Sequence, residues 1–120
     1  MRDAKEAVQL AKRAVDLSPG TGYLWNTLGL ACYRTGDWKA AIAALEKSMQ
    51  LYAGRTENQR RESFSTFPLA MAHWKLGDQK AARQCYDRAV GWMEKHQPKD
   101  EELRRFRTEA VELLGMEEKD

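Results

Sequence analysis

A ten-residue stretch occurs twice in this chain with the same order of residue types. LGLACYRTGD at Leu28–Asp37 returns as LAMAHWKLGD at Leu69–Asp78. Both copies run through leucine, a small residue, a bulky apolar residue and alanine, then an aromatic residue, a base and Gly-Asp. A chain that repeats such a pattern builds the same local unit more than once, and neighbouring units must stack to bury their apolar faces. The fold is therefore expected to be a repeat architecture.

A wider alignment extends the repetition to three segments. Glu6–Pro19 aligns with Ala40–Ala53, and Ala41 follows Ala7 by 34 residues. Ala40–Ala53 aligns in turn with Ala81–Glu94 at an offset of 41 residues, which is the same period with seven residues inserted. The sequence thus predicts one helical period that recurs with a single insertion near residues 54–63.

The spacing of small and apolar residues in these segments is typical of amphipathic helices, and nothing alternates with period two for long. Gly36 and Gly77 follow basic residues closely, as left-handed helix ends do. Asp37 and Asp78 stand where an N-cap would begin the next helix. These signals predict an all-α chain built from helix hairpins.

One segment also carries a known family pattern. Gly22–Ala53 contains W-x2-LG-x2-C followed by small residues at helical spacing, in the residues Trp25, Leu28, Gly29, Cys32, Ala41, Leu45 and Ser48. With the 34-residue period, this resembles the tetratricopeptide repeat family, whose repeats are pairs of antiparallel helices. The copy from Ser63 to Glu94 departs further from the pattern, with Thr66 in place of Trp and Ala70 in place of Gly. The second half is also similar, more loosely, to C-terminal repeat regions of large bacterial multidomain proteins, including eukaryotic-type serine/threonine kinases.

The resemblance implies a stack of antiparallel hairpins in a right-handed superhelix of about six helices, folded as one domain. Its expected parts are a half repeat at 1–20, a repeat at 21–54, an inserted loop at 55–62, a degenerate repeat at 63–97, a capping helix at 98–115 and a tail at 116–120. The capping helix would bury Leu103, Phe106, Ala110 and Leu113. Pro68 would cost about 3 kcal/mol inside a helix, so a kink or a helix start near Thr66–Phe67 is expected.

Composition excludes several classes of function. A net charge of +2 over 120 residues gives no reason to expect nucleic acid or an anionic membrane as partner, which also disfavours an RNA-binding helical repeat. No apolar run reaches the length of a membrane span, and the N-terminus lacks a signal-peptide core. Two cysteines on different repeats indicate a reducing, cytoplasmic setting and no metal site. His73 reads as a core residue and His96 as a helix-end residue. With no nucleophile beside a base and no phosphate loop, neither an enzyme nor a cofactor is expected.

The binding residues follow from the resemblance, which implies that the first helix of each hairpin lines a concave groove for a peptide. Helical spacing gives the side chains that share that face: Tyr23, Asn26, Leu30, Tyr33 and Arg34 on one helix, and Phe64, Phe67, Met71, Trp74 and Lys75 on the other. The alternative is that Phe64, Phe67 and Trp74 pack under the capping helix or the inserted loop. A clamp for a C-terminal carboxylate, as in some tetratricopeptide co-chaperones, is rejected because Phe64, Phe67 and Pro68 replace polar residues.

The first helix, Asp3–Leu17, is apolar on more than one side, and its stripe Ala4, Val8, Ala11 and Val15 is the predicted self-association surface of a homodimer. Two functions are thus expected. One is a protein–protein interaction module without catalysis. The other is a structural or oligomerisation segment of a bacterial multidomain regulator, for example a serine/threonine kinase.

Overall fold

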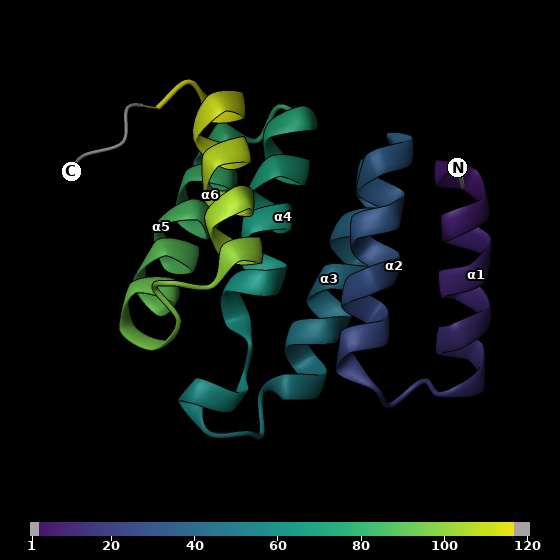
Figure 1. Cartoon of the computed structure of the whole chain (residues 1–120). Helices are drawn as coiled ribbons and strands as arrows, with labels where there is room; N and C mark the ends of the chain where they lie inside the picture. Colours follow the sequence, from purple (N-terminus) through teal and green to yellow (C-terminus); the bar gives the residue numbers. More distant parts are fainter. Residues whose placement is uncertain (1–2, 117–120) are drawn as a thin grey trace. The chain divides into compact units, whose positions relative to one another are not determined.

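The computed structural model describes residues 3–116 (Figure 1). These residues form six α-helices and one short 3-10 turn, and no strand occurs among them. In chain order the elements are α1 (Ala4–Leu17), α2 (Gly22–Thr35), α3 (Trp38–Tyr52), η1 (Glu57–Gln59), α4 (Glu62–Lys75), α5 (Gln79–His96) and α6 (Glu101–Leu114). The predicted all-α class is confirmed. The expected tail lies outside the described residues from position 117 onward.

The helices group into two compact units that meet in sequence between Arg61 and Glu62. In the first unit α2 packs against both α1 and α3, and Figure 1 shows each helix running opposite to the one before it. In the second unit α4 packs against both α5 and α6. Each unit therefore contains one complete antiparallel hairpin and one additional helix, as the repeat pattern implies.

Both hairpins turn in the same way. Gly36 and Gly77 adopt left-handed conformations, with φ of 86° and 89°, where a side chain would be strained. The amides of Asp37 and Asp78 donate to carbonyls five residues earlier, at 3.0 and 2.9 Å. Their carboxylates accept from the amides three residues later, at 3.3 and 3.0 Å. The predicted glycine ends and aspartate N-caps are thus confirmed in both copies.

Close approach of α2 and α3 depends on two glycines. A Cβ on Gly29 would lie 2.5 Å from Cγ of Leu45, which is fully buried. A Cβ on Gly22 would lie 2.6 Å from the ring of Tyr52. The buried hydroxyl of Ser48 donates to the carbonyl of Gly22 at 2.8 Å. These contacts fix the distance between the two helices of the first hairpin.

The second hairpin is buried over a longer stretch, since every residue from Ser63 to Ala72 is buried. Phe67 has no exposed surface, and its ring meets that of Tyr86 edge-on with centroids 6.0 Å apart. The hydroxyl of Ser63 donates to the carbonyl of Ala89. Over these residues α4 has no face left open to solvent.

Pro68 lies inside α4, so of the two expected outcomes, a kink or a helix start near Thr66–Phe67, the helix start is wrong. The helix begins four residues earlier, at Glu62. Proline removes one backbone donor, but the surrounding residues Ser63–Ala72 are all buried, and that burial offsets the lost hydrogen bond. Thr66 adds a hydrogen bond from its hydroxyl to the carbonyl of Glu62, at 3.0 Å.

The last helix, α6, begins with a side-chain cap and ends at a glycine. The carboxylate of Asp100 accepts from the amide of Leu103 at 2.9 Å, and Gly115 closes the helix with a φ of 69°. Leu103, Phe106 and Ala110 are buried as expected. The fourth buried position is Leu114, however, and Leu113 is only half-buried, because the stripe that faces α4 follows the 3.6-residue turn.

Candidate functional site

The accessible residues of α2 lie along one side of the helix. Tyr23 is 57% exposed, Asn26 and Leu30 are half-buried, and Arg34 is exposed at the end of the helix. Tyr33 is buried, and the guanidinium carbon of Arg34 lies 5.5 Å from the centre of its ring. An aromatic ring, an amide, an aliphatic group and a cation are therefore presented within three helical turns.

Neighbouring contacts hold α2 in place on both sides. The helix packs against α1 and α3. At its start the indole Nε1 of Trp25 donates to the carbonyl of Pro19 at 2.8 Å. One turn after Tyr23 the exposed Thr27 hydroxyl donates to the Tyr23 carbonyl at 3.0 Å. Thr27 was missed by the sequence interpretation, although it lies four residues from Tyr23 and so on the same side of the helix.

The counterparts on α4 have different surroundings. Phe64, Phe67 and Met71 are 5%, 0% and 0% exposed, so all three are core residues. Trp74 is half-buried and Lys75 is exposed at the end of the helix. Of the five predicted binding positions on α4, only these last two reach solvent.

The predicted self-association stripe on α1 divides in a similar way. Ala11 and Val15 are buried, and Ala4 and Val8 are half-buried. The exposed apolar side chains of this helix are instead Leu10 and Leu17, at 41% and 82%. The sequence predicted that this helix is apolar on more than one side, but it could not show which of the two sides α2 covers.

Two comparisons bear on these hairpins. A family model described as "Tetratricopeptide repeat" matches residues 20–95, which contain both hairpins except for the last residue of α5. The chain belongs to the tetratricopeptide repeat family. Repeats of this family are protein–protein interaction modules, and nothing enzymatic accompanies the match.

A relative of this repeat protein comes from a bacterium. Protein FlbA of Caulobacter vibrioides is 29% identical over 77 residues, which are 64% of this chain. The matched segment covers 13% of FlbA. The chain thus corresponds to a small part of the curated relative that it matches.

Two titratable groups of the repeat protein have pKa values shifted from the ordinary ones. Burial raises the pKa of the Cys32 thiol, and the nearby Asp37 carboxylate raises it further, so this thiol stays protonated at neutral pH. In the second unit the hydrogen bond that Arg88 donates to Glu62 raises the pKa of the guanidinium. His73 is half-buried, and the ring of His96 lies 5.0 Å from that of Trp92.

No group of three or more metal-ligating side chains gathers within residues 3–116. Over the same residues, no helix has the length and apolar character needed to cross a membrane.

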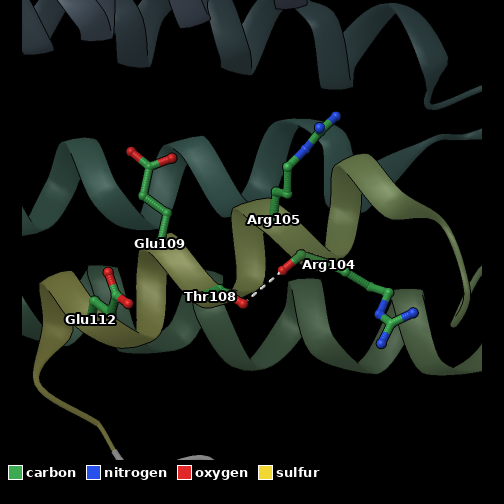
Figure 2. A pocket seen from close by; sticks show the side chains of 5 residues that line it. All are labelled: Arg104, Arg105, Thr108, Glu109 and Glu112. Atoms are coloured by element: carbon green, nitrogen blue, oxygen red, sulfur yellow. Dashed lines mark hydrogen bonds between the residues drawn. The ribbon is translucent and has the colours of Figure 1, made fainter.

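An open depression of about 320 Å³ lies along the outer side of α6 (Figure 2). Its lining side chains all come from this one helix: Arg104, Arg105, Thr108, Glu109 and Glu112. Among these lining residues, the two bases come first along the helix and the two acids come last.

Proposed function

We propose that this tetratricopeptide protein binds a protein partner through the accessible side of α2, without catalysis. The supporting observation is the exposure of α2 compared with α4. Tyr23 keeps more than half of its surface exposed, while the equivalent Phe64 is buried. A large aromatic side chain left exposed on a helix that is otherwise well packed is a frequent anchor of protein interfaces.

The accessible side chains of α2 indicate which kind of partner segment would fit this surface. Tyr23 and Leu30 offer apolar contact, Asn26 offers an amide, and Arg34 offers a cation at the C-terminal end. A segment that carries an apolar side chain followed by a carboxylate would match this order. Because α2 is packed against two other helices, the receptor surface is preorganised and little of the binding free energy is spent on ordering it. In the second unit, Trp74 and Lys75 are the remaining candidates for contact.

The proposal is tested with peptides selected for binding to the whole chain from a random display library. The affinity of a selected peptide is then measured by calorimetric titration against Tyr23→Ala and Arg34→Ala. We expect each substitution to weaken binding about tenfold, a loss within the range of interface anchors. The unfolding free energy of Tyr23→Ala should match that of the parent, since the side chain is largely exposed.

Lys80→Ala provides the matched control, because Lys80 is exposed on α5. Binding by this variant should be unchanged. Peptides that bind Tyr23→Ala and Lys80→Ala with equal affinity would show that α2 is not the binding surface.

A second candidate function is a structural or oligomerisation role within a bacterial multidomain regulator, in a reducing cytoplasmic setting. Leu17 at 82% and Leu10 at 41% exposure favour it, because apolar side chains on the outer side of α1 need a cover. The match to a short part of FlbA is consistent with this role. In this case the stripe Ala4, Val8, Ala11 and Val15 would support α1 from its packed side, and Leu10 and Leu17 would meet a second copy.

Sedimentation equilibrium distinguishes the two functions. Leu10→Asp combined with Leu17→Asp should convert a dimer to a monomer if α1 mediates association, and should leave peptide binding to α2 unchanged. A parent chain that is already monomeric at high concentration would eliminate the second function and leave the first intact.

A further inference from the structure

The outer side of α6 lies opposite its packed side. The buried residues Leu103, Phe106, Ala110 and Leu114 face the rest of the second unit. On the opposite side lie the residues that line the depression, of which Arg104, Arg105, Thr108 and Glu112 are exposed and Glu109 is half-buried (Figure 2). At 100° per residue these five positions span less than half a turn of the helix circumference. They form one continuous stripe, called here the α6 stripe.

Charges on the α6 stripe are ordered along the helix axis. The bases Arg104 and Arg105 occupy its N-terminal half, and the acids Glu109 and Glu112 occupy its C-terminal half. The last turn of α6 contains no basic residue. Ahead of the stripe, the first turn of α6 carries the acids Glu101 and Glu102, which suit the helix dipole, whereas acids at the C-terminal end of the stripe do not.

This order of charges is complementary to itself when two copies of α6 lie antiparallel. If a second copy of α6 lies antiparallel beside the first, each pair of arginines faces the pair of glutamates of the other copy. Arg105 and Glu112 are seven residues apart, so they lie two turns apart on the same side, about 10 Å along the axis. A two-fold axis near Thr108 then brings each Arg105 close to Glu112 of the other copy. Thr108 is short, so it permits close approach at the centre.

We propose that the α6 stripe is a docking surface for a second copy of this chain, paired antiparallel through α6. The charge order supports this occupant, because a two-fold interface requires a surface that is complementary to itself. The antiparallel arrangement also pairs the two helix dipoles favourably. This surface lies in the second unit and does not depend on the proposed binding role of α2 or on the leucines of α1.

The pairing is expected to be weak and sensitive to salt, because exposed ion pairs contribute little and are screened. We expect sedimentation equilibrium of the whole chain at low ionic strength to show a monomer–dimer equilibrium. Arg105→Glu alone and Glu112→Arg alone should each weaken the dimer about tenfold or more, since each places like charges together twice across the two-fold axis.

Mixing the two variants provides the decisive result. In a mixed dimer, Glu at position 105 of one copy meets Arg at position 112 of the other, while the native Arg105 and Glu112 meet at the second site. The mixture should therefore dimerise as the parent does, and so should the chain that carries both substitutions. If either residue only stabilised the fold of its own chain, adding the other variant would not restore dimerisation.

Leu17→Asp is the control for association through α1, and it should leave this dimer unchanged. Three results would each overturn the proposal. They are a parent that stays monomeric at all concentrations, a dimer that survives either single charge reversal but not Leu17→Asp, and a mixture that does not recover association.

Discussion

The two hairpins place the same hydrogen bond between the same positions but reverse its donor. In the first hairpin Ser48 on α3 donates to the carbonyl of Gly22 on α2. In the second, Ser63 on α4 donates to the carbonyl of Ala89 on α5. Gly22 and Ser63 are equivalent at the 41-residue offset, and so are Ser48 and Ala89. The contact between the hairpin helices is thus kept while the residue that supplies the hydroxyl changes.

The helices that carry these contacts differ in what they leave exposed. Positions 23, 26 and 30 on α2 are exposed or half-buried, whereas positions 64, 67 and 71 on α4 are buried. The residues agree with this difference: Asn26 on α2 is replaced by Phe67 on α4. Because α4 packs against both α5 and α6, apolar side chains are stable there. The same repeat position is therefore accessible in one hairpin and part of the core in the other.

The largest expected effect comes from Phe67→Ala. Truncating a fully buried phenylalanine removes its edge-on contact with Tyr86 and leaves a cavity, at a cost of about 3–5 kcal/mol. At the equivalent position, Asn26→Ala should change the unfolding free energy by less than about 1 kcal/mol. Urea unfolding followed by circular dichroism measures both. Equal losses for the two substitutions would contradict the proposed difference between the hairpins.

Gly29→Ala should have the next largest effect. The added methyl would meet Cγ of Leu45 at 2.5 Å and force the two helices apart, although alanine is the better helix former. We expect a net loss of about 1–2 kcal/mol in urea unfolding. The second hairpin already has alanine at this position, Ala70, and Tyr86 stands at the position equivalent to Leu45. If Leu45→Ala in the same chain does not recover part of the Gly29→Ala loss, the close approach is not the cause.

Removal of either hydroxyl tests the reversed hydrogen bond. Ser48→Ala and Ser63→Ala should each cost about 1 kcal/mol, the usual net contribution of a buried hydrogen bond. The pair Ser63→Ala and Ala89→Ser would place the donor where the first hairpin has it, so the combined variant should recover most of the loss. Chemical denaturation of the three variants checks this. A combined variant less stable than Ser63→Ala alone would show that the two hairpins are not equivalent here.

The smallest effect is expected from Gly91→Ala, and its sign is opposite. Gly91 is exposed in α5 and a Cβ there would meet nothing within 4 Å. Alanine should therefore stabilise the helix by about 0.5–1 kcal/mol. A thermal melt measures the change, and a loss of stability at Gly91 would weaken the explanation offered for Gly29.

Much of the fold was predictable because it depends on local signals. Gly36, Asp37 and their counterparts 41 residues later define the turns by backbone conformation and side-chain caps alone. The outcome at Pro68 was not predictable, since the cost of one missing donor is offset by burial that only the packed unit creates. Exposure on α2 and α4 was only partly predictable. Packing of Phe64 and Phe67 was one of two alternatives, and tertiary packing decides that Phe64 is covered while Tyr23, at the same place in the pattern, is not.

The central claim is that α2 leaves positions 23, 26 and 30 accessible while α4 buries the equivalent positions 64, 67 and 71. Hydroxyl-radical footprinting of the native chain, read by mass spectrometry, measures both helices in one sample. The account predicts rapid oxidation of Tyr23 and protection of Phe64, Phe67 and Met71, although a methionine sulfur is readily oxidised when exposed. Urea should abolish that protection. Oxidation of Met71 in the native chain as fast as that of Tyr23 would contradict the account.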